Sequence, residues 1–293
     1  MRPNYGFTLS SGYATYLTNP TTAQCQKLLG FSRRGVSQEI TMFTAKQRDH
    51  VRNYVVEMAQ ADPRVTGGAL IGSTAAGVED SWSDIDVTFG IATGNTIETV
   101  IDDWTQKLEQ EFGVLHHFDL HAGSSLYRVF LLPNGLEIDV SATPEGDFGA
   151  RGPHFHTLFG RAQQQLNTPP PPDTSHMIGL CWHHIFHTRS CIERRKPWQA
   201  AYWISEVRNH TLALACIRLG ESAAHGRSVD KLPADVTNSF ADTLVRSLDE
   251  QELRRALAAV TMCLIAEIEQ WDTTLCARLQ PLLQEFGALQ VKV

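Results

Sequence analysis

Four consecutive prolines divide the chain into two halves with different hydrophobic patterns. The stretch NTPPPPDT covers residues 167–174, and a proline run continues neither helix nor sheet because proline lacks a backbone N–H donor. Such a run favours an extended spacer. Before it, apolar residues follow helix and strand periods in turn, and after it they follow the helix period almost to the end. We therefore predict two domains, an α/β domain followed by an all-α domain.

The same patterns indicate four segments. Residues 1–41 are rich in Ser, Thr, Tyr and Gly and follow neither period, so we expect an N-terminal extension outside the α/β fold. An α/β domain over residues 42–166, the proline linker over 167–174 and a helical domain over 175–293 complete the chain.

The first half alternates helix and strand. A helix that ends at Asp62-Pro63 precedes the predicted strands VTGGALIG and DIDVTFGIA, and a second amphipathic helix ends at Gly113. The apolar runs LYRVFLL and LEIDVSAT flank the turn PNG, which predicts a β-hairpin. Residues 146–160 are rich in Gly and aromatic side chains, and we expect a connecting loop there.

The second half reads as helices throughout. Apolar residues at helical spacing predict helices over residues 176–194, 198–220, 234–247 and 250–285, with a break at GRSVDKLP. Pro233 and Asp249 are residue types that favour helix starts.

Composition excludes several classes of protein. A net charge of −7 argues against nucleic acid as a partner, since nucleic-acid binders present a basic face. No apolar run approaches the ~20 residues of a membrane span, and the first residues lack the pattern of a signal peptide. The six cysteines show no CxxC spacing, so we expect a reduced, cytoplasmic protein.

The stretch LIGSTAAGVEDSWSDIDVTF carries the strongest chemical signal. Side chains alternate faces in a strand, so Asp84 and Asp86 point the same way, roughly 7 Å apart along the chain. Two carboxylates this close repel each other unless a cation lies between them. Mg²⁺ suits the arrangement because it prefers oxygen ligands, usually one or two carboxylates together with substrate phosphates.

Two further features favour phosphate chemistry. Gly72-Ser73 ends the neighbouring strand, where a glycine lets the backbone approach a phosphate and exposed N–H groups bind it. Asp139, in LEIDVSA, is a third carboxylate on a paired strand. Three acids, a phosphate cradle and two metal ions are the components of two-metal phosphoryl transfer.

These residues resemble a known superfamily, the polymerase β-type nucleotidyltransferases. Its signature is Gly-Ser, a spacer and Asp-x-Asp, and LPNGLEIDVSAT is similar to the strand that carries the third aspartate in aminoglycoside 6-adenylyltransferases. The match covers residues 65–143. In the helical half, VRNHTLALACIRLG and HGRSVDKLP resemble the carboxy-terminal helices of streptomycin-type adenylyltransferases. Lincosamide adenylyltransferases and uncharacterised actinobacterial nucleotidyltransferase-domain proteins are also similar.

The resemblance implies transfer of a nucleoside monophosphate, from ATP or another nucleoside triphosphate, to an acceptor hydroxyl with release of pyrophosphate. Asp84 and Asp86 would hold two Mg²⁺ ions, and Asp139 would bind the ion nearer the attacking oxygen. The fold implied is α+β: a polymerase β-like nucleotidyltransferase domain, with a mixed sheet and flanking helices, followed by an all-α helical-bundle domain.

The resemblance also implies nucleotide-binding residues. Gly72 and Ser73 would bind the β- and γ-phosphates, and Ser83 would help to orient that end. Residues 189–231 are locally basic, as the second wall of a triphosphate site requires, and from this segment the resemblance favours Arg208 and Lys231.

Glu206, in YWISEVRN, is a candidate general base for the acceptor hydroxyl or a contact for a cationic acceptor. Glu193, in RSCIERR, is the competing candidate, and either glutamate can instead pair with a neighbouring arginine.

Three functions remain open from sequence. The first is transfer to a small molecule, with an aminoglycoside or lincosamide antibiotic as acceptor, since an acidic surface fits a cationic acceptor better than RNA. The second is transfer to RNA or protein, as in toxin–antitoxin components, although those domains are generally shorter. The third is a catalytically inactive nucleotide-binding relative, against which three retained aspartates argue because buried unpaired carboxylates are costly without a metal.

Overall fold

The computed structural model describes residues 42–152, 154–164 and 171–287. The chain divides into two compact units, Met1–Thr168 and Pro169–Val293, with the boundary at the start of the proline run. The expected extension over residues 1–41 and part of the linker lie outside the described residues.

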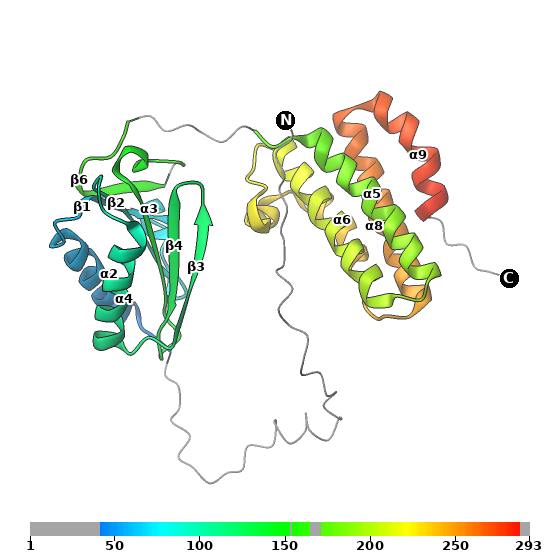
Figure 1. Cartoon of the computed structure of the whole chain (residues 1–293). Helices are drawn as coiled ribbons and strands as arrows, with labels where there is room; N and C mark the ends of the chain where they lie inside the picture. Colours follow the sequence, from blue (N-terminus) through cyan, green and yellow to red (C-terminus); the bar gives the residue numbers. More distant parts are fainter. Residues whose placement is uncertain (1–41, 153, 165–170, 288–293) are drawn as a thin grey trace, which may run out of the picture. The chain divides into compact units, whose positions relative to one another are not determined.

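The first unit is a six-stranded mixed sheet with helices (Figure 1). Its strand order is β3-β4-β5-β2-β1-β6; β2 and β5 are parallel and every other pair is antiparallel. The strands are β1 (Val65–Ile71), β2 (Ile85–Ile91), β3 (His116–Ala122), β4 (Ser125–Leu131), β5 (Glu137–Pro144) and β6 (Phe155–Gly160). The helices are α2 (Ala45–Gln60), α3 (Gly72–Ala76), α4 (Ile97–Phe112) and the 3₁₀ turn η1 (Glu145–Asp147).

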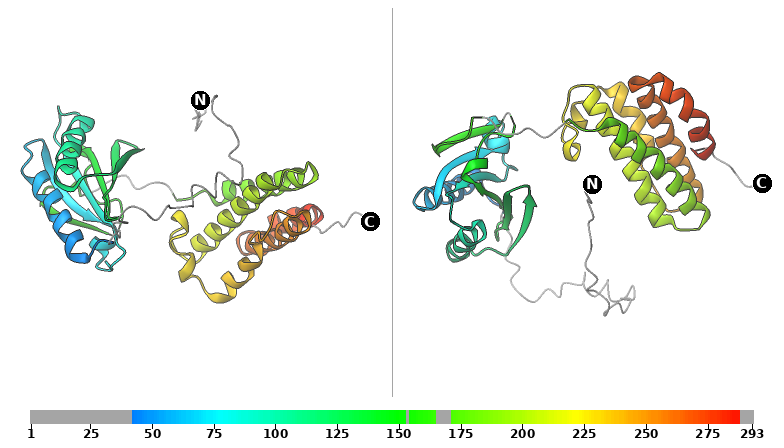
Figure 2. Two further views of the ribbon diagram at one scale, coloured as in Figure 1. Left: turned by 90° about the horizontal axis from the view of Figure 1, so that it is seen from below. Right: turned by 45° about the horizontal axis from the view of Figure 1, so that its top comes forward.

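Helices α2 and α4 pack on one face of this sheet and bury its apolar side chains (Figures 1 and 2). Alternate residues of β2 and β5, such as Val87 and Val140, are buried there against Trp104 of α4. Since side chains alternate along a strand, the intervening residues of β2 and β5 face the other side. That side holds a set of polar residues that we call the polar face: Asp86, Thr88, Ser125, Tyr127, Asp139, Ser141 and Thr143.

Local signals explain where α2 and α4 begin and end. Thr44 and Gln47 form a capping box at the start of α2, in which each side chain bonds the backbone of the other residue. Gly113 ends α4 in the left-handed conformation, at φ 66°, which glycine adopts without steric cost.

The second unit is all-helical, as predicted. Its long helices α5 (Thr174–Glu193), α6 (Pro197–Arg218) and α8 (Glu250–Trp271) lie side by side around a buried apolar core that also contacts α9 (Thr273–Gly287) (Figures 1 and 2). No helix among the described residues is long and apolar enough to cross a membrane.

The expected helix over residues 234–247 is wrong. The chain forms only one turn there, α7 (Ala234–Thr237), and then a 3₁₀ segment, η4 (Asn238–Thr243). The buried Thr243 hydroxyl donates to the Phe240 carbonyl at 2.6 Å, a local bond that competes with α-helical pairing.

The single helix expected over residues 250–285 is also wrong, because the chain breaks at Asp272. This residue is extended, at φ −156° and ψ 98°, and its carboxylate accepts a hydrogen bond from the Leu275 N–H at 2.8 Å. Asp272 therefore ends α8 and caps α9.

The expected loop over residues 146–160 is only partly a loop. Its last part forms the edge strand β6, which pairs antiparallel with β1. The part of this segment before β6 begins near Phe148, whose buried side chain (1% exposed) packs over Gly67 and Gly90 and anchors the chain. A Cβ on either glycine would meet the Phe148 ring at 2.6 Å or 2.9 Å, so both glycines make room for this anchor.

Candidate functional site

Asp86 and Asp139 occupy directly paired positions on the parallel strands β2 and β5. Neighbouring strands lie about 4.8 Å apart and paired residues point to the same face, so the two carboxylates are adjacent on the polar face. Asp84 immediately precedes β2 and is half-buried. The structure thus brings together the three aspartates that sequence analysis singled out.

The electrostatics of Asp139 show that these acids crowd one another. Burial, together with the charges of Asp86, Asp84 and Glu137, raises the pKa of the Asp139 carboxyl to about 6. Its Oδ1 atom is buried and accepts no hydrogen bond from any described residue. A buried carboxylate oxygen without a donor, beside other carboxylates, is compensated either by a proton, which the raised pKa favours, or by a bound cation.

The phosphate cradle predicted at Gly72-Ser73 lies against the same acids. Gly72 begins α3 with φ +63°, and a Cβ built on it would lie 2.0 Å from Asp86 Oδ2. Only glycine therefore lets the backbone pass this close to the carboxylate. Ser73 Oγ is buried without a hydrogen-bond partner among the described residues, so its hydroxyl is free to meet a ligand.

Glu79 and Arg48 hold the segment between Ser73 and Asp84, and sequence analysis missed them. Glu79 Oε1 accepts from Thr74 Oγ1 at 2.8 Å and from Arg52 at 2.7 Å, and lies 3.1 Å from Arg48 Nε. Arg48, 4% exposed, also donates to the Asp80 carbonyl. The network connects α2, α3 and the segment leading to Asp84. The sequence signal that could have revealed this network is Arg48, a charged residue on the otherwise apolar, buried stripe of α2.

Ser83 does not present a free hydroxyl in this structure. Its Oγ accepts from the Asp80 N–H at 2.9 Å and lies 3.1 Å from Asp80 Oδ1, which closes a local turn. The side chain therefore stabilises the approach to Asp84, and its predicted role towards phosphate stays a prediction.

The chemistry of the aspartates fits Mg²⁺, although the side chains do not yet form its coordination shell. Among residues 42–152, 154–164 and 171–287, no three His, Cys, Asp or Glu side chains are arranged to hold a metal ion. Carboxylates without a cation repel each other and turn apart. The atoms that Asp84, Asp86 and Asp139 offer to a cation are all carboxylate oxygens, the ligands that a hard cation such as Mg²⁺ prefers. They include Asp139 Oδ1, which has no hydrogen-bond partner among the described residues.

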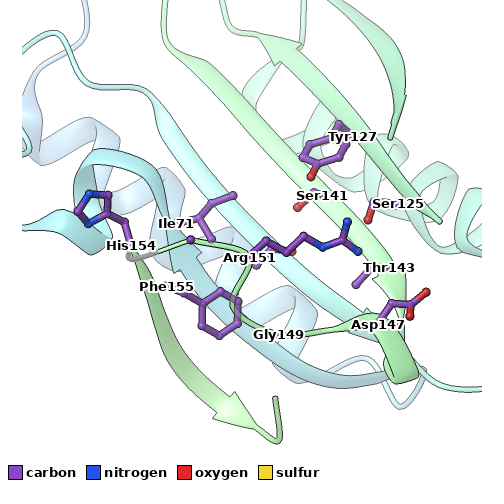
Figure 3. A pocket seen from close by; sticks show the side chains of 12 residues that line it. Ile71, Ser125, Tyr127, Ser141, Thr143, Asp147, Gly149, Arg151, His154 and Phe155 are labelled. Atoms are coloured by element: carbon purple, nitrogen blue, oxygen red, sulfur yellow. The ribbon is translucent and has the colours of Figure 1, made fainter. Parts of the chain in front are cut away.

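A pocket of about 180 Å³ continues from the acids along the polar face (Figure 3). Its floor is formed by residues that follow the aspartates at intervals of two, Thr88 after Asp86 and Ser141 and Thr143 after Asp139. The segment after Phe148 closes one side with Gly149, Arg151, Gly152 and His154. The sequence analysis assigned this segment no chemistry. The floor of the pocket, by contrast, follows the alternation of polar residues in DIDVT, which leads into β2, and in DVSAT of β5.

The predicted site residues of the helical unit are described within that unit alone. Arg208 of α6 is half-buried and forms no hydrogen bond or ion pair with any described residue, and burial lowers the pKa of its guanidinium. An uncompensated, partly buried cation favours an anionic ligand. Lys231 is exposed, and its Nζ lies 3.8 Å from Glu221 Oε2.

Glu206 and Arg208 do not share a face of α6. Residues two positions apart on a helix are separated by about 200° around its axis, so the side chains of Glu206 and Arg208 point to nearly opposite sides. Glu193 is engaged in ion pairs, at 2.9 Å from Arg189 and 2.9 Å from Arg254. Those contacts give Glu193 a structural role, whereas the Glu206 carboxylate has no such partner among the described residues.

Comparisons with known proteins find similarity at the level of structure alone. No protein-family model and no curated protein matches the chain. The structure is similar to an aminoglycoside 6-adenyltransferase from Bacillus subtilis, with 12% identity and a TM-score of 0.37 over 82% of this chain and 98% of that one. It is also similar to a nucleotidyltransferase-like protein from Exiguobacterium sibiricum 255-15, with 15% identity and a TM-score of 0.36 over 80% of each chain. Similarity this low carries no conclusion about activity, which rests on the site itself.

Proposed function

We propose that this protein is a nucleotidyltransferase that moves a nucleoside monophosphate, AMP from ATP in the first instance, to a hydroxyl of a small molecule. The observation that carries the proposal is the pairing of Asp86 with Asp139 beside the glycine corner at Gly72. A polyphosphate bound at that corner lies next to the carboxylates that hold its counter-ions, as phosphoryl transfer requires.

Each residue has a defined task in the proposed reaction. Gly72 and Ser73 bind the β- and γ-phosphates through backbone N–H groups and the serine hydroxyl. Asp84, Asp86 and Asp139 would hold two Mg²⁺ ions. When bound, these ions would neutralise phosphate charge and lower the pKa of the acceptor hydroxyl.

The bond changes are those of an in-line displacement. The acceptor oxygen forms a bond to the α-phosphorus, the bond from that phosphorus to the bridging oxygen breaks, and pyrophosphate leaves. The acceptor proton passes to a base, for which Glu206 is the candidate, while Asp139 would help to hold the ion that lowers the pKa of the acceptor hydroxyl. Alignment and charge neutralisation do most of the remaining work.

Arg208 and Lys231 are proposed to bind phosphate from the helical unit, with Arg208 favoured because it lacks an acidic partner among the described residues. Glu206 is proposed to contact a cationic acceptor or to act as a base. An aminoglycoside or lincosamide antibiotic is the acceptor class that the sequence resemblance favours, and the net charge of −7 agrees with a cationic acceptor.

Labelled ATP, Mg²⁺ and a panel of antibiotics test the proposal. We expect pyrophosphate release that depends on one acceptor and on Mg²⁺. Release that requires RNA or a protein instead would move the acceptor to the macromolecular class. Nucleotide binding without turnover on any acceptor would leave an inactive nucleotide-binding relative as the remaining candidate, and failure to bind any nucleotide would refute the proposal.

A further inference from the structure

Two histidines on α5 of the helical unit direct their ring nitrogens at each other. His183 and His187 are four positions apart, so they lie on one side of the helix, one turn apart. Their Nε2 atoms are 3.0 Å apart, and the rings meet edge to face with centroids 4.4 Å apart. Both residues are exposed. The pair therefore presents two imidazole nitrogens to solvent at one point of the surface.

The separation of the two nitrogens suits a shared metal ion. Zn²⁺ binds histidine nitrogen at about 2.0–2.1 Å, so two nitrogens on one ion lie roughly 2.9–3.4 Å apart at angles between a right angle and the tetrahedral angle. The 3.0 Å between His183 and His187 lies in this range. Rotation of the rings is enough to admit the ion, and the helix itself need not change.

Aromatic neighbours hold the two rings in place. Trp203 of α6 stacks on the His187 ring, with 26° between the planes and 5.4 Å between the centroids. Trp203 is itself packed against the buried His184 at 4.6 Å. On the other side of the pair, Trp182 meets the His183 ring edge to face at 6.0 Å. A ligand ring that is already restrained by packing loses less conformational entropy when it binds an ion.

Binding of an ion requires a change of tautomer. In the free pair, one ring carries its proton on Nε2 and donates it to Nε2 of the other ring. Both Nε2 lone pairs must face a bound ion, so the donating ring transfers this proton to its own Nδ1 through solvent. Each exposed ring can then donate from Nδ1 to water, as the second nitrogen of a metal-bound histidine usually does.

The ligand atoms select the class of ion. Imidazole nitrogen suits Zn²⁺, Cu²⁺ and Ni²⁺, whereas Mg²⁺ prefers oxygen ligands. No third His, Cys, Asp or Glu side chain in the described part of the chain joins the pair in a group that could hold a metal ion. The chain therefore supplies two ligands, and water completes the coordination.

We propose that His183 and His187 form a chelating site for a divalent transition metal ion, which bridges two consecutive turns on the exposed side of α5. The site uses none of the residues assigned to nucleotidyl transfer. Its ion differs in chemical class from the Mg²⁺ proposed at the aspartates, so either proposal can fail without the other.

Calorimetric titration of the full chain with Zn²⁺ tests the site. Excess Mg²⁺ is present throughout, so that carboxylate sites are occupied. The wild type binds Zn²⁺, and His183→Gln and His187→Gln each lower the affinity at least about tenfold, because the second ligand of a chelate acts at a high effective concentration. Glutamine is a good helix former and the rings are exposed, so both variants keep a metal-free melting temperature close to that of the wild type.

His176→Gln is the matched control. His176 is an exposed histidine in the first part of the same helix, but the positions three and four residues after it are Gly179 and Leu180, which offer no ligand. Its substitution leaves Zn²⁺ affinity unchanged.

Electron paramagnetic resonance of bound Cu²⁺ gives a second readout. The wild type and His176→Gln show coupling to two imidazole nitrogens, and His183→Gln and His187→Gln do not. Absence of Zn²⁺ binding in the wild type would overturn the proposal. So would equal Zn²⁺ affinity in the wild type and both paired variants, or a Cu²⁺ spectrum that neither paired substitution changes.

Discussion

Asp139 lies directly opposite Asp86 across two parallel strands, although 53 positions separate them in sequence. The crossover between β2 and β5 contains a helix and two strands, so only the finished sheet creates the pair. The consequence is a carboxyl with a pKa of about 6 and an oxygen that no described residue compensates. The following predictions depend on that relationship.

Asp84→Asn and Asp86→Asn each lower turnover by at least about a hundredfold and leave the protein folded. Each change removes a charge needed to hold the counter-ions of the triphosphate, while it relieves repulsion on Asp139. Steady-state kinetics and thermal melting by circular dichroism check both parts. Near-normal turnover in either variant would overturn the metal assignment.

Asp139→Asn stabilises the Mg²⁺-free protein at neutral pH. The folded-state pKa of about 6 exceeds the ordinary value of 3.8, so the folded protein binds more protons between these values and loses stability as pH rises through them. At pH 8 the loss amounts to ~1–2 kcal/mol once solvent screening is allowed for. Asp139→Asn does not suffer this loss, because an asparagine carries no charge at any of these pH values.

Urea unfolding at pH 8 and pH 4 measures this effect. We expect Asp139→Asn to exceed the wild type in free energy of unfolding at pH 8 and to match it at pH 4. Mg²⁺ should raise the stability of the wild type and not of the variant. If Asp139→Asn and the wild type had equal free energies of unfolding at pH 8, burial and the neighbouring carboxylates would not destabilise the ionised Asp139.

Gly72→Ala should inactivate the protein, whereas Gly77→Ala should not. Both glycines have left-handed backbone, at φ +63° and +69°, so each substitution costs about 1–2 kcal/mol of stability. The new Cβ at position 72 would collide with Asp86 Oδ2, while no described atom lies within 4 Å of the one at position 77. The melting temperature should fall in both variants, and further in Gly72→Ala because of the collision. Turnover should fall only for Gly72→Ala; equal turnover would contradict the tight corner.

Arg208→Ala should raise the KM for the nucleotide about tenfold without lowering the melting temperature, because Arg208 has no acidic partner among the described residues. Arg218→Ala, in the same helix, is the control. It breaks two hydrogen bonds to the buried Glu267, at 2.8 Å and 3.0 Å, and should cost about 2–3 kcal/mol of stability with no change in KM. Unchanged KM in Arg208→Ala would remove this residue from the site.

The sequence predicted the fold class because the relevant signals are local. Period-two alternation located β2 and β5, the Asn-Gly turn located the hairpin of β4 and β5, and helical periods located α2, α4, α5 and α6. The same alternation correctly put Asp86 and Asp139 on faces opposite to Val87 and Val140.

Features that depend on long-range pairing were missed. Strand β6 contains the strand-favouring Phe155, Thr157 and Phe159, but the Gly-rich sequence before it favoured a loop. The strand pairs with β1, about 90 residues earlier. The pocket depends in turn on Phe148 lying over Gly67 and Gly90, a contact between three distant segments. No periodicity encodes such a contact.

Errors in the helical half have a local physical cause. Thr243 and Asp272 bond to nearby backbone groups and interrupt helices that the apolar pattern continues. Glu206 and Arg208 lie two positions apart on α6, so the helix turns their side chains to nearly opposite sides, and their proposed roles stay predictions. The strand pattern put Asp139 on a strand paired with that of Asp86, and the pairing of β2 with β5 confirms this placement.

Calorimetric titration with a non-hydrolysable ATP analogue tests the central claim most directly. The account predicts that the wild type binds the analogue in the presence of Mg²⁺ and at least tenfold more weakly in EDTA, and that Asp86→Asn removes this Mg²⁺ dependence. Equal affinity of the wild type with Mg²⁺ and with EDTA, or a Mg²⁺ response in Asp86→Asn equal to that of the wild type, would contradict a divalent-cation site at Asp84, Asp86 and Asp139.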